Sequence, residues 1–250
     1  FSSSSFFEFT KEFMSFEPEA YSLKWYKQML GICGADVTTV CTNKWMMGVR
    51  NSFIIGIAST FLATALGTVA ALGLSRPHMP YKVLIMAILI SPMIVPLIIT
   101  AAGMFFFYSQ LGLTHTFTGL ILAHTALGTP FVVITVTATL TGFDTNLIRA
   151  SQSLGADTLR TFFKVIMPLI LPGVISGALF AFITSFDEVV VVLFIGSIEQ
   201  VTIPKQMWAG LRQETSPVIL SMATCLVLLS IALLTTVELL RRRSERLRGI

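Results

Sequence analysis

The chain alternates between long apolar runs and short polar segments. Asp, Glu, Lys and Arg are absent from Asn51 to Ser75, from Val83 to Phe143, from Val165 to Phe186 and from Thr215 to Val237. A helix needs about 20 apolar residues to cross a bilayer, because each residue advances it by ~1.5 Å across ~30 Å of hydrocarbon. Each of these runs is therefore long enough to span a membrane.

The longest run must fold back on itself, and the polar segment SQLGLTHT (109–116) is its expected turn. The pattern predicts an all-α, polytopic transmembrane helical bundle. Five spans are expected, near 52–74, 83–107, 117–141, 169–195 and 217–240. Pro92 and Pro96 lie four residues apart in the second span, and each removes a backbone donor. They are expected to bend or open that helix.

Composition excludes a soluble domain. Apolar residues make up 54% of the 250 residues and charged residues 12%, and the mean hydropathy is +0.81. A soluble globular domain carries roughly 25% charged residues, so this chain has too few to coat a water-exposed surface.

The basic residues predict an orientation. The tail 241–250 holds five Arg against one Glu, and such clusters stay on the cytoplasmic side. Counting back places the loops 75–82 and 142–168 on that side too. The domain layout is then an external segment 1–51, a transmembrane domain 52–240 and a cytoplasmic tail. Because the first segment lies outside, a further helix upstream of Phe1 is expected, making six spans in the native chain.

Chemistry-bearing residues are sparse. Cys33 and Cys41 in the external segment could pair in an oxidising compartment or stay free thiols. His124 lies within a span, where it is expected to make an interhelical hydrogen bond. Gly173 and Gly177 form a GxxxG pair that lets another helix approach closely. No histidine has metal-ligand spacing and no G-x-x-x-x-G-K-[ST] loop occurs, so no metal site and no ATP site of that type are expected.

One cytoplasmic loop has a distinctive pattern, RASQSLGADTLRTFFKVIMPLILPG (149–173). Gly155 interrupts an amphipathic stretch, as expected where two short helices meet at an angle. Pro168 is expected to end the loop and Pro172 to open the next span. One apolar side is marked by Ile148, Ser151, Leu154, Leu159, Phe162 and Phe163. Physics alone leaves two interpretations: an amphipathic helix on the lipid surface, or a docking element for a soluble partner.

The loop resembles the "EAA" loop of the membrane subunits of bacterial ABC importers. The family pattern reads here as Arg149-Ala150-Ser151, then Gly155, then Met167-Pro168, with matching spacing. Arg149 replaces the family glutamate. In that family the loop inserts a short coupling helix into a groove on the ATPase subunit. The resemblance therefore implies ATPase coupling through Arg149, Ala150, Ser151, Gly155, Ala156, Asp157 and Pro168.

Further segments look like the second permease subunit of the polyamine-importer branch. They are LKWY (23–26), SPMIVPLI (91–98), SFDEVVVVLFIG (185–196), TIPKQMW (202–208) and SPVILSMAT (216–224). The resemblance implies a transport subunit, not an enzyme, in a bacterial inner membrane. The implied partners are a second permease, an ATPase dimer that binds ATP and Mg²⁺, and a periplasmic binding protein; no cofactor and no nucleic acid is expected on this chain. Two alternatives stay open: an importer of an opine or amino-acid-like solute, and a stand-alone channel or secondary transporter.

The resemblance implies a polyamine such as spermidine or putrescine as the substrate, and Asp187 and Glu188 give the physical case for a small organic cation. An acid in hydrocarbon costs roughly 2.5–3.5 kcal/mol, so both are expected to face water, a partner or a substrate near the outer end of their span. Gly177, Ala181 and Thr184 are expected to share a small, polar face with Glu188. The predicted substrate path comprises Ser185, Asp187, Glu188, Trp25, Phe186 and Thr184.

Overall fold

A computed structural model describes residues 24–32, 44–76, 78–142, 144, 146–213 and 218–247. Every regular element in these ranges is a helix. Cys33, Cys41 and most of the expected external segment lie outside the described residues. The same holds for the side chains of the basic tail.

Three long helices form the centre of the bundle: α3 (Lys44–Leu74), α6 (Phe117–Thr141) and α9 (Met167–Asp187). They pack closely because small residues line the contacts. A Cβ added to Gly177 would lie 2.8 Å from the Cα of Val132, and one added to Gly173 would overlap Thr139. The close approach predicted from this GxxxG pair is confirmed, and its partner is α6.

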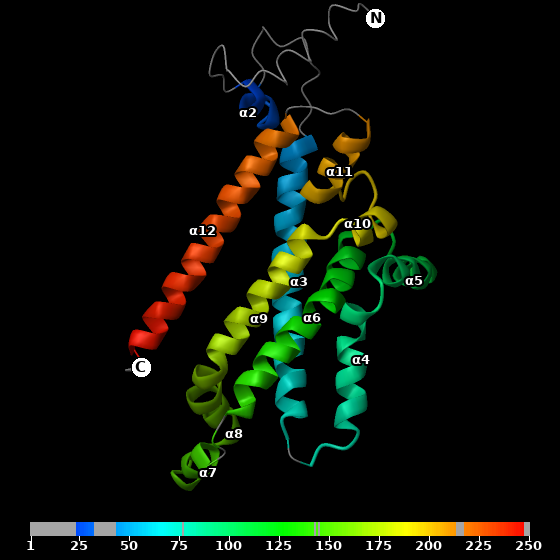
Figure 1. Cartoon of the computed structure of the whole chain (residues 1–250). Coiled ribbons are helices and arrows are strands. Elements are labelled where there is room, and N and C mark those ends of the chain that lie inside the picture. The colour runs from blue at the N-terminus through cyan, green and yellow to red at the C-terminus, as the bar shows by residue number, and fades with distance from the viewer. Residues whose placement is uncertain are drawn as a thin grey trace, which may run out of the picture.

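The second predicted span is broken. Helices α4 (Lys82–Ile94) and α5 (Leu97–Gln110) meet at an angle of 104°. Pro96 forces the preceding residue, Val95, into an extended conformation with ψ 136°. Pro92 cannot donate to Ile88, whose carbonyl instead accepts a 2.8 Å hydrogen bond from the Ser91 hydroxyl. The predicted bend is confirmed, and it turns α5 out of the line of α4, so that Figure 1 shows α5 almost end-on beside the upper part of α6.

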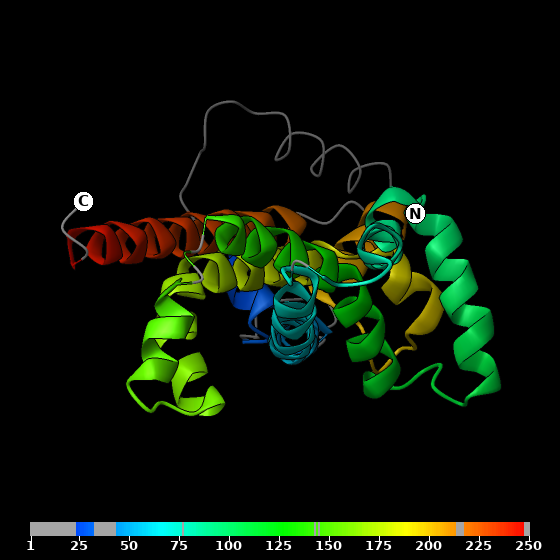
Figure 2. The same cartoon turned by 90° about the horizontal axis from the view of Figure 1, so that it is seen from below.

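The bundle has two distinct ends (Figure 1). One end, the α7 end, holds the α3–α4 connection, α7 (Asn146–Ser153) and the C-terminal part of α12 (Val218–Leu247). The other, the α11 end, holds α2 (Lys24–Met29), the α5–α6 connection and α11 (Ile203–Gln213). The predicted alternation of loops between two sides is therefore confirmed. Viewed from below, α5 and the α7 segment project to opposite sides of α3 (Figure 2).

The predicted span boundaries need correction. Among the described residues, three helices are long and apolar enough to cross a membrane, or four if α4 and α5 form one span. The described apolar part of α12 is Val218–Ala232. The fourth span does not run from 169 to 195, because its helix ends at Asp187 and a separate helix, α10 (Val190–Ile195), follows. Its start is also earlier, since α8 (Thr158–Thr161) and η1 (Phe162–Ile166) continue directly into α9.

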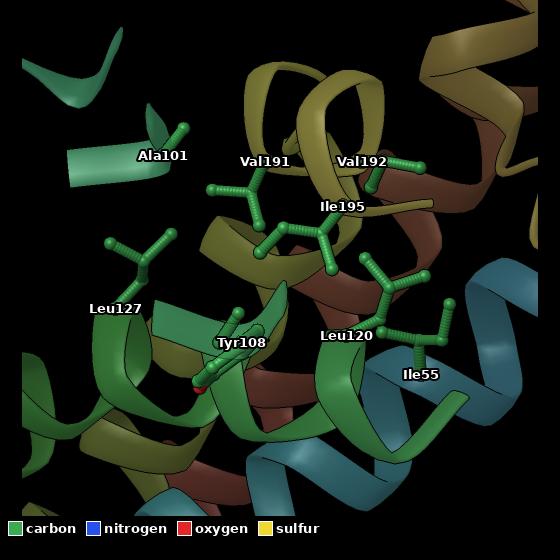
Figure 3. Packing of buried hydrophobic residues seen from close by; sticks show 9 residues of the cluster. Ile55, Ala101, Tyr108, Leu120, Leu127, Val191, Val192 and Ile195 are labelled. Atoms are coloured by element: carbon green, nitrogen blue, oxygen red, sulfur yellow. The ribbon is translucent and has the colours of Figure 1, made fainter. Parts of the chain in front are cut away.

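An apolar cluster anchors α10 at the α11 end (Figure 3). Val191, Val192 and Ile195 of α10 are fully buried. They pack against Ile55, Ala101, Tyr108, Leu120, Ala123 and Leu127 from α3, α5 and α6. Because α10 turns into this cluster, the chain leaves the line of α9 directly after Asp187.

Candidate functional site

A pocket of ≈ 520 Å³ opens at the α11 end, between α9, α11 and α12. Its lining residues are Phe182, Ile183, Phe186, Asp187, Val189, Pro204, Met207, Trp208, Leu211, Leu226, Leu229 and Ser230. Asp187 is the acid in this lining, and no lysine or arginine belongs to it in the part of the chain that the structure describes. Phe182 and Phe186 stack with ring centroids 5.4 Å apart. The pocket thus offers one carboxylate on aromatic and aliphatic walls.

The two neighbouring acids have different environments. Asp187 ends α9, is exposed and lines the pocket. Glu188 is only 7% exposed, and its Oε1 accepts a 2.9 Å hydrogen bond from the Val191 amide at the start of α10. Asp187 can meet a solute, whereas Glu188 is occupied with the backbone of its own chain.

The proposed small, polar face on α9 contacts other helices rather than the pocket. Ala181 packs against Gly128 of α6 and Gly177 against Val132. Glu188 lies beyond the helix end, so it does not continue the face. Thr184 is partly buried and, like Gly177 and Ala181, is absent from the pocket lining.

Ser185 belongs to a buried polar group in the bundle centre. Its Oγ lies 3.0 Å from the Ser59 Oγ of α3 and 2.7 Å from the His124 Nδ1 of α6. This group joins the three central helices, and it confirms the interhelical hydrogen bond expected for His124. Ser185 therefore lies behind the pocket wall.

The two aromatic residues of the predicted path pack against the same buried cluster. Phe186 lines the pocket, and its ring also meets Phe53 at 5.4 Å. Trp25 of α2 packs against a buried cluster formed by Met29, Ile203, Val218 and Met222, as Phe186 does. Trp25 is not one of the lining residues of the pocket.

Sequence reasoning missed Trp208. This side chain lines the pocket opposite α9, and the Arg212 guanidinium lies 5.5 Å from its ring centroid. The available signal was the spacing of Pro204, Met207, Trp208 and Leu211, which places four apolar residues on one face of a helix.

Polar contacts attach the segment before α11 to the bundle. Asn51 Nδ2 donates to the backbone carbonyls of Glu199 at 2.7 Å and Val201 at 2.9 Å. The Ser52 hydroxyl accepts from the Ile203 amide at 2.9 Å. Lys205 is half-buried, and burial lowers the pKa of its ammonium. The hydrogen bonds of Asn51 and Ser52 thus join residues about 150 positions apart in sequence.

At the α7 end, Gly155 ends α7 with φ +81°. The Gly155 amide donates to the Gln152 carbonyl at 2.9 Å and the Ala156 amide to the Ser151 carbonyl at 3.1 Å. These two bonds define a Schellman motif, which favours glycine at its left-handed position. The predicted meeting of two short helices at Gly155 is confirmed.

The rest of the loop is held by local contacts. Asp157 caps α8, since its Oδ1 accepts from the Arg160 amide at 2.9 Å. The Ser151 and Thr161 hydroxyls lie 2.9 Å apart and join α7 to α8. Pro168 does not end the loop; it lies in the first turn of α9, directly after the π-helical turn η1 that continues into α9. Arg149 and Ala150 are exposed.

Large apolar side chains remain uncovered on this loop. Leu154 is 88% exposed, Leu159 68% and Phe163 63%. We call these three residues the α7-end apolar surface. It lies on the arm that projects from the bundle in Figure 2.

Comparison with known families identifies the class of protein. Residues 63–246 match the family described as binding-protein-dependent transport system inner membrane component. The chain belongs to this family. It is thus a permease subunit that works in an inner membrane with a substrate-binding protein and an ATPase.

Individual relatives refine the comparison. The spermidine/putrescine transport system permease protein PotC of Haemophilus influenzae is 27% identical over 237 residues, covering 95% of this chain and 88% of that protein. The putrescine transport system permease protein PotI of Escherichia coli is also 27% identical, covering 83% and 73%. The MetNI methionine ABC transporter, in an inward-facing conformation, gives a TM-score of 0.62 at 21% identity, covering 80% of this chain and 95% of the matched one.

Proposed function

We propose that this chain forms one half of the translocation path of an importer for polyamines, with the second half supplied by a different permease subunit. The observation that carries the proposal is the exposed Asp187 carboxylate in an aromatic and aliphatic pocket whose described lining contains no basic residue. The names of the PotC and PotI relatives support the same substrate class.

A polyamine combines ammonium groups with short alkyl chains, and the pocket matches both parts. A hydrogen bond to a charged group contributes about 1.5–3 kcal/mol. Aromatic faces add about 0.5–2 kcal/mol to the binding of a cation, and Phe186 and Trp208 are aromatic residues of the pocket lining. The aliphatic lining can cover the methylene groups between two charges.

The α7-end apolar surface would dock on the ATPase subunit. Three exposed apolar side chains on a segment held by its own short-range hydrogen bonds suit a preformed element that enters a groove. With such docking, the α7 end and the tail 241–250 would lie in the cytoplasm, and the α11 end would lie outside, facing the binding protein. ATP and Mg²⁺ would bind the partner ATPase.

One observation favours an opine or amino-acid-like solute instead. Arg212 lies over the Trp208 ring beside the pocket, where it could meet a carboxylate. Uptake by proteoliposomes that contain the complete importer and its binding protein separates the two. Saturable, ATP-dependent uptake of labelled spermidine or putrescine supports the polyamine proposal. Uptake of octopine without either polyamine contradicts it.

A further inference from the structure

The short helix α10 has a charged side chain at each end. At its start, the Glu188 carboxylate accepts from the Val191 amide at 2.9 Å. A carboxylate at a helix N-terminus meets the positive end of the backbone dipoles and satisfies a free amide. Glu188 thus fixes the start of α10 directly beside Asp187.

Lys205 holds the other end of α10. Its Nζ donates to the backbone carbonyls of Val192 at 3.3 Å, Gly196 at 3.2 Å and Ser197 at 3.1 Å. An ammonium group has three donors, and here each has an acceptor. Because the backbone dipoles place partial negative charge at the end of a helix, a cation at this place is stabilising.

These two contacts connect opposite walls of the pocket. Glu188 follows Asp187, the carboxylate of the α9 wall. Lys205 lies in α11 between Pro204 and Met207, which with Trp208 form the opposite wall. Between them, α10 is held by its buried cluster (Figure 3) and by the His115 amide, which donates to the Ile195 carbonyl at 2.8 Å. A rigid link therefore runs from one wall to the other.

We propose that Glu188 and Lys205 are positioning residues that clamp α10 and so set the separation of Asp187 from Trp208 across the pocket. The clamp thereby selects cationic substrates by their own dimensions. What matters is the distance in the substrate between an ammonium group, which meets Asp187, and the alkyl chain next to it, which meets Trp208. This inference rests on the proposed polyamine function for its substrate, but the clamp itself can be tested without a substrate.

Hydrogen exchange in the assembled importer, reconstituted in lipid nanodiscs, is the first measurement. Lys205→Met removes the hydrogen bonds that the charged ammonium group makes to α10. Amide exchange in peptides covering 188–197 is therefore expected to become about ten- to a hundredfold faster. Lys205→Arg retains a multiple donor and is expected to restore most of the protection. Exchange in α6 serves as the internal reference. Unchanged exchange in Lys205→Met overturns the clamp.

Uptake kinetics with labelled spermidine and putrescine are the second measurement. Lys205→Met is expected to raise KM by about tenfold for at least one of them, with the maximal rate kept within about twofold and partial rescue by Lys205→Arg. Glu188→Gln keeps an amide oxygen as acceptor and is expected to stay close to wild type, whereas Glu188→Leu should behave like Lys205→Met. Glu199→Gln, which removes an exposed acid nearby, is the control.

The outcomes separate the two proposals. If Glu188→Gln raises KM as much as Asp187→Asn does, Glu188 acts through its charge on the substrate and the clamp is overturned. If the wild-type importer takes up neither polyamine, the proposed function is overturned, and the exchange measurement still decides whether the clamp exists.

Discussion

The two ends of the bundle are held together in different ways. At the α11 end, Asn51 and Ser52 reach segments about 150 residues away, and α10 is buried within the bundle. At the α7 end, the hydrogen bonds of residues 146–166 join residues at most ten positions apart, and large apolar side chains stay exposed. The α11 end is thus held by contacts between distant segments, whereas the α7-end apolar surface lies on a segment held by its own short-range contacts.

The largest expected effect tests that surface. The double variant Leu154→Asp, Leu159→Asp places two charges where the proposed contact excludes water, and burial of unpaired charge is strongly unfavourable. Copurification of the ATPase should fall below detection, with uptake reduced more than about a hundredfold. The matched control, Leu154→Met with Leu159→Met, should retain both. Normal copurification by the aspartate variant contradicts the docking role.

Asp187→Asn tests the other end. Loss of one charge-assisted hydrogen bond at about 1.5–3 kcal/mol should slow polyamine uptake by roughly ten- to a hundredfold. ATPase association should persist, because the change lies at the α11 end. Wild-type uptake by this variant would mean that the pocket carboxylate is merely solvated.

Gly155→Val tests the turn between α7 and α8. The position has φ +81° with open space around an added Cβ, so the cost is backbone strain rather than a clash. A left-handed residue with a side chain costs about 1–2 kcal/mol, which corresponds to roughly 5–30-fold in the population of the correct loop. ATPase stimulation by the binding protein should fall accordingly. Gly155→Asn should be milder, and Gly142→Ala, at φ −89°, should have no effect; equal loss in all three would contradict the strain argument.

The smallest expected effect is on the thermal stability of the complex. It comes from removing one hydrogen-bonding side chain at each end. Ser151→Ala removes a partly buried hydroxyl that donates to the Ile148 carbonyl and contacts the Thr161 hydroxyl, with an expected cost of about 0.5–1.5 kcal/mol for each contact. Asn51→Ala removes two bonds and leaves two carbonyls unsatisfied, at about 1–3 kcal/mol for each. Thermal unfolding of the purified complex should therefore show a larger shift for Asn51→Ala. A larger shift for Ser151→Ala would reverse the comparison of the two ends.

Much of the architecture follows from the sequence because membrane insertion depends on local properties. Span length is set by bilayer thickness, so the charge-free runs predict where helices lie. The end of α3, both ends of α6 and the start of α12 fall within one residue of the predicted positions. The bend at Pro96 and the turn at Gly155 follow from the backbone chemistry of proline and glycine, which acts on immediate neighbours.

Tertiary structure decided what Asp187 and Glu188 each do. In sequence they are two adjacent acids in one apolar run, and the hydropathy of VVVVLFI gives no reason to end the helix before it. Helix α9 ends there because α10 is buried among α3, α5 and α6. The Val191 amide of α10 also donates to the Glu188 carboxylate. Likewise, Trp208 reaches the pocket only because α11 folds back against α3, which brings it to the pocket lined by the end of α9. These contacts join residues far apart in the chain, and a local pattern carries no information about which distant surface will bury it.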